Sequence, residues 1–258
     1  MLHRAARRPQ FFYTTAPLPC PYLAGRTERK IVTELAGNEA EALHDRLSRA
    51  GFRRSHNIAY SPVCPGCRAC IPIRIITGAF QPDRSQRKVM KANADIAAYE
   101  MPARASAEQF ALFQRYQTAR HGDGDMAAMG FYDYRAMVED TPITTGMVEF
   151  RDARNRLLGA CLTDWLSDGL SAVYSFYEPD ADKRSLGTYA ILWLVSRARS
   201  LGLPYVYLGY WVPESRKMAY KARFRPSETL SGGMWRVLPE HADAAPAAAD
   251  HARISVTG

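Results

Sequence analysis

The sequence predicts an α+β protein: a mixed, largely antiparallel sheet flanked by helices, preceded by a small cysteine-containing N-terminal lobe. Two observations indicate the sheet. Three strand-like runs follow one another across short turns, as in an antiparallel meander: GMVEF, LLGACLTDWL and LSAVYSFY. A helical segment then leads into one further strand-like run, PYVYLGYW. The third observation is a cysteine-rich turn between two earlier strand-like runs, CPGCRAC, which indicates the separate small lobe.

The chain length of 258 residues accommodates one large domain or two modest ones. Changes in composition divide it into four segments. We expect an irregular N-terminal arm over residues 1–19, the cysteine-containing lobe over 20–100 and the larger lobe over 101–238. Residues 239–258 are Ala-rich and aperiodic, so we expect a disordered tail there.

The small lobe is expected to hold one helix, over residues 39–50. Asn38 can cap this helix, Glu41 can complete a capping box and Gly51 can end it. The strand that enters the cysteine turn is predicted from GFRRSHNIAYSPVC, and the strand that leaves it from IPIRI. We place all of these elements in the small lobe.

Three helical segments precede the meander. The basic stretch 83–95 begins a helix, and Ser106 with Gln109 forms a capping box for a second one. A third, short helix is predicted over residues 131–139. These segments supply the helices that flank the sheet.

The meander, a glycine-containing loop, a helix and a strand follow the order of a GNAT-like acyltransferase core. We expect the helix over residues 186–201, ended by Gly202. Its N-terminus, after Ser185, offers backbone N–H groups that suit a phosphate, and Gly187 permits close approach. A simple left-handed turn explains this glycine equally well. The segment contains few of the basic and glycine residues that are expected in a coenzyme A-binding loop, which favours a different ligand.

The charge favours a polyanionic partner, an anionic membrane surface or an acidic substrate. Lys and Arg number 34 against 26 Asp and Glu, a net charge of +8. Four basic residues lie within a stretch of eight: Arg84, Arg87, Lys88 and Lys91. A second basic cluster begins at Lys217. A soluble basic enzyme without a polyanionic partner explains the net charge as well.

Composition excludes several classes of protein. A hydrophobic fraction of 47% is too high for a disordered chain, and the longest apolar run, Tyr189–Val195, is too short to span a membrane. The first 20 residues lack the apolar region of a secretory signal. We therefore expect a cytoplasmic protein without a membrane partner.

Four cysteines are candidates for a metal site. Cys64, Cys67 and Cys70 form two overlapping C-x-x-C steps, and Cys20 is the other candidate before Cys161. A tight turn of this kind suits a structural zinc ion or an iron–sulfur cluster. The alternative is a group of reduced structural thiols, with Cys161 buried as a small apolar side chain.

Tyrosines concentrate around the predicted central strands, at Tyr174, Tyr177, Tyr205, Tyr207, Tyr210 and Tyr220. Their hydroxyl groups could line a cleft and position a substrate or relay a proton. Half-buried packing on alternate strand positions is the alternative. Asp164 interrupts an otherwise apolar strand, where it either forms a structural ion pair or holds an amine.

Several long blocks resemble the arginyl-tRNA–protein transferase family. They are CPYLAGRTERK, GFRRSHNIAYSPVCPGCRACIPIRI, LLGACLTDWLSDGLSAVYSFYEPD, RSLGTYAILWL and YLGYWVPESRKMAYKARFRPSE, spanning about Cys20 to Glu228. The compact chain is similar to the bacterial branch. One position departs from the eukaryotic members, which have a C-x-x-C near the N-terminus where Cys20 is followed by Pro21, Tyr22 and Leu23.

The resemblance implies a GNAT-like fold, aminoacyl-tRNA in place of acyl-coenzyme A, and chemistry without a cofactor. It implies a cleft in which the candidate catalytic residues are Asp164, Tyr174, Tyr207 and Tyr210. The candidate substrate-binding residues are Tyr177, Ser185, Gly187, Tyr220, Lys221 and Arg223, of which Lys221 and Arg223 would receive an acidic side chain of the acceptor. The candidate tRNA-binding residues are Arg84, Arg87, Lys88, Lys91 and Lys217, and the candidate metal ligands are Cys20, Cys64, Cys67 and Cys70.

The bacterial branch implies transfer of leucine from leucyl-tRNA to the α-amine of proteins that begin with Asp or Glu, which marks them for degradation. Arginyl transfer to the same acceptors is the first alternative, because no residue identifies the donor amino acid. An acetyltransferase that uses coenzyme A is another. A metal-stabilised RNA-binding module without catalysis is the alternative from a different class.

Overall fold

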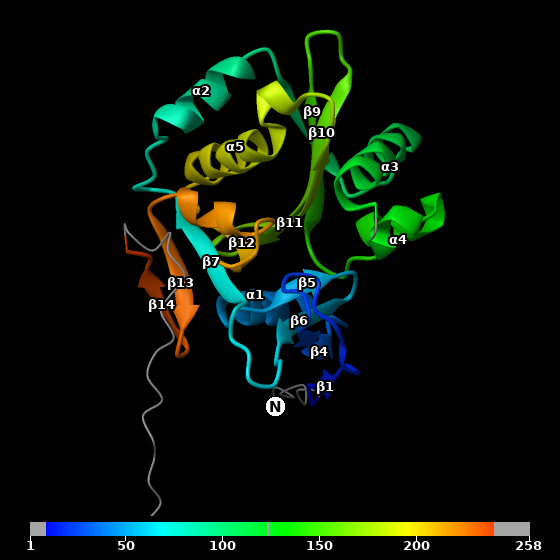
Figure 1. The fold of residues 1–258 in the computed structure, drawn as a ribbon, viewed down its shortest axis with the longest axis vertical. Helices are drawn as coiled ribbons and strands as arrows, with labels where there is room; N and C mark the ends of the chain where they lie inside the picture. Colours follow the sequence, from blue (N-terminus) through cyan, green and yellow to red (C-terminus); the bar gives the residue numbers. More distant parts are fainter. Residues whose placement is uncertain (1–8, 123, 240–258) are drawn as a thin grey trace, which may run out of the picture.

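The computed structural model describes residues 9–122 and 124–239, which form a large sheet with helices on both faces and a smaller sheet at one end (Figure 1). Within these residues, eight strands make up the large sheet, in the order β14-β13-β7-β12-β11-β10-β9-β8. Their bounds are β7 (Ile71–Ile76), β8 (Ala97–Pro102), β9 (Thr145–Arg151), β10 (Leu157–Leu166), β11 (Gly169–Tyr177), β12 (Tyr205–Trp211), β13 (Ser227–Ser231) and β14 (Met234–Val237).

The centre of the large sheet confirms the predicted α+β class. Strands β9, β10 and β11 form the antiparallel meander, and helix α5 (Leu186–Ser200) connects β11 to β12. Strands β11 and β12 are parallel, whereas the other neighbouring pairs in this sheet are antiparallel. The order of meander, loop, helix and parallel strand is the one expected for the acyltransferase-like core.

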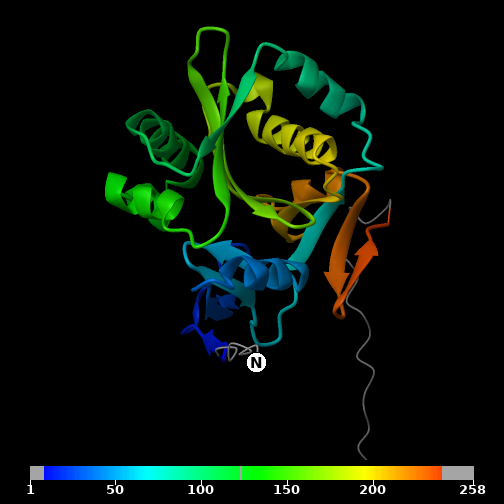
Figure 2. The same ribbon diagram turned by 180° about the vertical axis from the view of Figure 1, so that it is seen from behind.

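Helices cover the two faces of the large sheet and bury separate cores (Figures 1 and 2). On one face, α5 and α2 (Arg84–Ala92) pack over a core that includes Leu194 and Val206. On the other face, α3 (Ala107–His121) and α4 (Phe131–Glu139) pack over a core that includes Phe113 and Phe176. Burial of each large apolar side chain stabilises the fold by about 1.5–3 kcal/mol.

The smaller sheet lies beneath the large one in Figure 1 and carries helix α1 (Ala40–Arg49). Its order is β1-β4-β6-β5, with bounds Tyr13–Thr14, Lys30–Glu34, Ile58–Pro62 and Arg53–Ser55 respectively. A separate pair joins β2 (Leu18–Pro19) to β3 (Thr27–Glu28). Short 3₁₀ helices complete the described elements: η1 (Asp125–Ala128), η2 (Asp182–Arg184) and η3 (Ala219–Arg223).

Local sequence signals place most helix ends. Ser106 and Gln109 form the expected capping box, and Asp83 with Gln86 forms a second one at the start of α2. The prediction for α1 was wrong at its start, because Glu39 occupies the cap position without a side-chain hydrogen bond and Asn38 does not cap the helix.

Other differences concern strands. The run IPIRI is β7, which lies in the large sheet between β12 and β13 and not in the small lobe. Residues 97–102, for which no strand was expected, form the edge strand β8. The large sheet therefore contains strands from both expected lobes, residues 20–100 and residues 101–238.

Two expected segments fall largely outside the described residues: positions 1–8 of the arm and 240–258 of the tail. Residues 9–19 of the arm include the short strands β1 and β2. In the described part of the chain, none of the helices combines the length and the apolar character needed to cross a bilayer.

Candidate active site

A split between the two parallel strands forms the centre of the candidate site. The ladder between β11 and β12 pairs Gly169–Ser171 with Tyr205–Tyr207 and extends no further. Among the residues that the structure describes, β11 has no strand partner on this side beyond Ser171. Backbone groups on such an edge can bind a carbonyl oxygen or an oxyanion. The split is therefore the candidate place for acyl-transfer chemistry.

One side chain from the small sheet enters the split. Arg53, on β5, donates hydrogen bonds to the backbone oxygens of Ala172 (3.1 Å) and Val173 (2.7 Å) on β11 and of Leu208 (3.1 Å) on β12. Sequence reasoning missed this residue, because an arginine in the run GFRRSHN carries no motif. The adjacent arginines on a predicted strand were the only available signal.

Aromatic side chains gather at the end of β11, next to helix α3. The ring of Tyr177 lies 4.8 Å from that of Tyr116, and Gln117 donates a hydrogen bond to the hydroxyl of Tyr174 (2.5 Å). Burial raises the pKa of Tyr174 to about 12, and burial with the phenols of Tyr177 and Tyr174 raises the pKa of Tyr116. These phenols therefore stay protonated at neutral pH and can donate hydrogen bonds. Sequence analysis did not single out Tyr116 and Gln117 as site residues.

The loop before α5 brings Gly187 against this cluster. A Cβ at Gly187 would lie 2.9 Å from Cε1 of Tyr177, closer than real Cβ contacts allow. Ser185 precedes the helix in a left-handed conformation (φ 50°), and its side chain does not cap it. The structure thus brings Tyr177 and Gly187 together, and the glycine is needed for the close approach of the ring.

Lys221 does not sit where an acceptor carboxylate could reach it. Its side chain is 6% exposed, and Nζ donates to the backbone oxygen of Tyr210 (2.8 Å). Burial, aided by the nearby charge of Arg53, holds the pKa of Lys221 well below its usual range. The expected contact of Lys221 with an acidic substrate is therefore corrected to a contact with β12. Tyr220 and Arg223 are exposed on either side of it.

Tyr207 and Tyr210 lie apart from the tyrosine cluster and hold strands together. The hydroxyl of Tyr207 accepts from Arg74 (3.0 Å) and donates to Asp168 (3.1 Å). The hydroxyl of Tyr210 lies 3.1 Å from the backbone oxygens of both Gly51 and Tyr60. Both side chains are buried, so neither hydroxyl is presented to a substrate.

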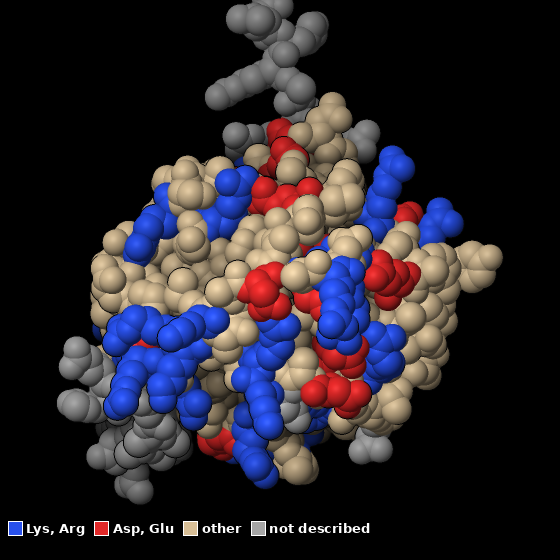
Figure 3. Space-filling view, turned by 90° about the horizontal axis from the view of Figure 1, so that it is seen from above, with Lys and Arg blue, Asp and Glu red and all other residues tan. Residues whose placement is uncertain are grey.

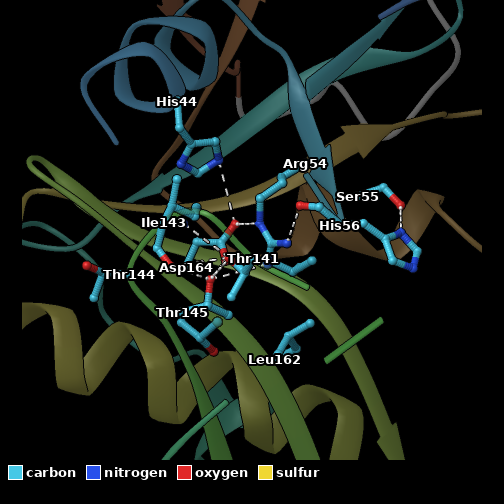
Figure 4. A network of polar contacts seen from close by, with 12 residues as sticks. His44, Arg54, Ser55, His56, Thr141, Ile143, Thr144, Thr145, Leu162 and Asp164 are labelled. Atoms are coloured by element: carbon cyan, nitrogen blue, oxygen red, sulfur yellow. Dashed lines mark hydrogen bonds and ion pairs between the residues drawn. The ribbon is translucent and has the colours of Figure 1, made fainter. Parts of the chain in front are cut away.

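Asp164 forms a buried ion pair instead of facing a substrate (Figure 4). Arg54 donates to both carboxylate oxygens, with distances of 2.8 Å to Oδ2 and 2.6 Å to Oδ1, and Thr145 donates to Oδ1 (2.8 Å). The ring of His44 points at the same carboxylate, with Nε2 3.6 Å from Oδ2. Asp164 has no exposed surface. Its catalytic assignment is therefore corrected to the structural alternative.

The predicted cationic cluster lies on the outer surface of α2. Arg84, Arg87, Lys88 and Lys91 are exposed, and Figure 3 shows basic side chains gathered over α2, whereas basic and acidic side chains alternate over the opposite side of that face. A groove of about 620 Å³ runs between α2 and the start of α5; it is lined by Arg84, Ser85, Lys88, Val89, Ala92, Lys183 and Ser185. Lys217 lies elsewhere, near His121, and contributes to lowering the pKa of that histidine.

The four N-terminal cysteines line one small cavity, of about 40 Å³, together with Tyr22, Tyr60 and Tyr210. Cys64 accepts a hydrogen bond from the backbone N–H of Arg29 (3.4 Å), and Cys67 accepts one from Arg26 (3.4 Å). Burial and the neighbouring thiols raise the pKa of Cys70 to about 12. Within the described residues no three His, Cys, Asp or Glu side chains are placed to share a metal ion. In this arrangement the four N-terminal thiols do not fit a bound metal ion. The fifth cysteine, Cys161, is buried in the core.

Two family models match this chain. Residues 18–88 match the model described as arginine-tRNA-protein transferase, N terminus, and residues 108–231 match the one described as its C terminus. An L-PGS structure from Bacillus licheniformis aligns with a TM-score of 0.43 and 10% identity, over 69% of this chain and 52% of that chain. A glucosamine N-acetyltransferase region of a fungal multi-domain protein aligns with a TM-score of 0.40 and 8% identity, over 76% of this chain and 22% of that chain.

Full-length relatives are far more similar. The aspartate/glutamate leucyltransferase of Gluconacetobacter diazotrophicus is 62% identical over 252 residues, which cover 96% of this chain and 97% of that protein. Its namesake from Granulibacter bethesdensis is 65% identical over 233 residues, covering 90% and 87% respectively. That from Paramagnetospirillum magneticum is 61% identical over 236 residues, covering 92% and 97%. The chain therefore belongs to the arginine-tRNA-protein transferase family, in the branch of the aspartate/glutamate leucyltransferases.

Proposed function

We propose that this protein transfers leucine from leucyl-tRNA to the α-amine of proteins whose first residue is Asp or Glu, which makes them substrates for degradation. The observation that carries the proposal is the split between β11 and β12, bordered by partly buried phenols at one end of β11. The identity with leucyltransferases over nearly the whole chain favours leucine over arginine as the donor amino acid.

The reaction is the aminolysis of an ester. The acceptor nitrogen forms a bond to the leucyl carbonyl carbon, and the bond from that carbon to the ribose oxygen of the tRNA breaks. The proton lost by the amine ends on the ribose oxygen. An α-amino group has a pKa of about 7.7–8.0, so a useful fraction is neutral at cellular pH and a strong base is not required. Positioning can supply roughly 7–11 kcal/mol of the barrier reduction.

Residues around the split divide the remaining tasks. Backbone N–H groups near Tyr174–Phe176 would stabilise the oxyanion, and the phenol of Tyr174 or Tyr177 would relay the proton. The part of β11 beyond Ser171, which does not pair with β12, and the protonated state of Tyr174 at neutral pH support these roles. No cofactor takes part in any of these steps.

The two substrates, the tRNA and the acceptor protein, would bind to different surfaces. Phosphates of the tRNA would lie on α2, along the groove that Arg84, Lys88 and Lys183 line towards Ser185. Arg223, which is exposed at the end of η3, would receive the acidic side chain of the acceptor. Its backbone oxygen accepts a hydrogen bond from Gln86 of α2 (3.1 Å), which ties the two surfaces together.

An acceptor assay tests the proposal. Two peptides, beginning with Asp and with Ala, are each offered radiolabelled leucyl-tRNA and arginyl-tRNA. Label from leucyl-tRNA on the Asp peptide alone is the expected result. Label from arginyl-tRNA would overturn the donor assignment, and tight tRNA binding without any transfer would favour the non-catalytic RNA-binding module.

The acceptor site has its own test. Arg223→Gln should raise KM for the Asp peptide and leave the affinity for leucyl-tRNA unchanged. Arg46→Gln, an exposed arginine on α1, is the matched control. Equal losses of peptide and tRNA binding would assign Arg223 to the tRNA surface instead.

A further inference from the structure

Arg53 belongs to the small sheet but makes its hydrogen bonds in the large one. It lies on β5, which packs against β11 (Figure 1). Its guanidinium group contacts backbone oxygens on both sides of the split, Ala172 and Val173 on β11 and Leu208 on β12. One side chain therefore bridges two parallel strands at the point where their own ladder has ended.

The hydrogen bonds of Arg53 satisfy backbone oxygens that the split leaves without a strand partner. Carbonyl groups at the end of a parallel ladder lose their strand partners, and a buried unpaired carbonyl costs about 1–3 kcal/mol. Arginine presents five donors in a fixed planar fork, which matches oxygens on two strands at once. A lysine has three donors around a single atom and cannot span the same gap in one plane.

Strand β12 carries the matching feature, Gly209. This residue has φ +75°, and a Cβ built on it would lie 1.4 Å from Nη1 of Arg53. The register of β12 against β7 shifts between Tyr207 and Gly209. The irregularity in β12 and the missing side chain together make room for the guanidinium. Arg53 and Gly209 are thus complementary in shape, although 156 residues of sequence separate them.

The separation of β11 from β12 determines where the edge of β11 lies relative to a bound ester. Donors aimed at a developing oxyanion act only if they are held in place, and a misplacement of 1 Å can cost about 100-fold in rate. We propose that Arg53 is a positioning residue for acyl transfer: it holds β11 and β12 at a fixed separation, so that the small lobe sets the geometry of the cleft. This inference rests on the proposed function.

Kinetics of Arg53→Ala test the proposal. We expect kcat for leucyl transfer to fall by about 100-fold, with little change in KM for leucyl-tRNA, because the guanidinium group of Arg53 is proposed to act on the substrate only through β11 and β12. Guanidinium ion, added well below denaturing concentrations, should restore part of kcat. Arg53→Lys should stay impaired, because it keeps the charge and loses the fork. Arg46→Ala, with or without guanidinium, is the control.

Hydrogen exchange gives a readout that does not depend on turnover. Amides of β11 and β12 at the split should exchange faster in Arg53→Ala than in the wild-type protein, and guanidinium should slow them again. A raised KM with unchanged kcat, or lost activity with unchanged exchange at the split, would overturn the proposal. If the wild-type protein transfers no amino acid, the proposed function fails, while the exchange experiment still decides whether Arg53 holds the strands.

Discussion

Arg54 and Asp164 join the two sheets through an ion pair from which water is excluded, with both carboxylate oxygens bound by one guanidinium group. Arg53, the preceding residue, reaches the split between β11 and β12. Neighbouring residues on a strand point to opposite faces. The two adjacent arginines of β5 therefore attach the small lobe to the large sheet at two places, one structural and one beside the candidate cleft.

Removal of one partner of the buried pair should destabilise the protein strongly. Arg54→Met leaves Asp164 charged and uncompensated, which costs about 3–5 kcal/mol in comparable buried pairs. The measurement is the midpoint of urea unfolding at constant m-value. In Arg54→Met/Asp164→Leu the unpaired charge is gone, so most of the stability should return. A single variant within 1 kcal/mol of wild type would contradict the assignment.

The double variant also separates the structural role of Asp164 from a catalytic one. If the carboxylate only holds the lobes together, Arg54→Met/Asp164→Leu should transfer leucine at a rate close to wild type at a temperature where both proteins are folded. A loss of kcat in this double variant without a loss of stability would show that Asp164 has a catalytic role.

The same network makes stability depend on pH through His44. Burial, opposed by the nearby charge of Asp164, lowers the pKa of this histidine from its usual 6.5, and Arg54, Asp45 and Ser48 are its other polar neighbours. The unfolded chain then binds a proton that the folded protein does not. Stability contributed by neutral His44 is complete above pH about 6.5 and declines as the pH falls from there towards the folded pKa. His44→Gln should flatten the unfolding free energy over that interval; an unchanged slope would show that other groups cause it.

Patterns of local chemistry predicted most of the fold. The capping box at Ser106 and the meander 145–177 follow from residues close together in sequence. Membership of β7 in the large sheet does not, because IPIRI suits any buried strand and its partners are more than 100 residues away. Pairing over such a separation is decided by the packing of the whole chain.

Prediction of the site was more uneven. The predicted site residues Tyr174 and Tyr177 lie at the end of β11, and the closely spaced cations of α2 are exposed; the roles of both groups stay predictions. Residue type alone could not separate Tyr174 and Tyr177 from Tyr207 and Tyr210, because all four are tyrosines on largely apolar strands. Arg53 was missed because its partners are backbone oxygens, which leave no mark in the sequence.

The cations of α2 should control the salt dependence of tRNA binding. Each phosphate contact removed from a duplex reduces the slope of log K against log salt by about 0.9. Arg84→Ala/Lys88→Ala should therefore bind leucyl-tRNA more weakly at low salt and with a shallower slope. Arg46→Ala/Arg236→Ala removes the same charge from exposed positions on α1 and β14, away from α2. Equal slopes in the two double variants would show that net charge, and not this surface, binds the tRNA.

Arg53 and Gly209 provide a double-mutant cycle. A side chain at Gly209 would occupy the place of Nη1 of Arg53, so Gly209→Ala should lower kcat to about the level of Arg53→Ala. Because both changes remove the same bridge, the double variant should be no slower than either single one, and the coupling free energy should nearly equal the loss in one single variant. Gly209→Ala also strains a left-handed backbone, which lowers stability, so kcat is compared where circular dichroism shows each protein folded. Additive losses in kcat would mean that Gly209 acts on the cleft independently of Arg53.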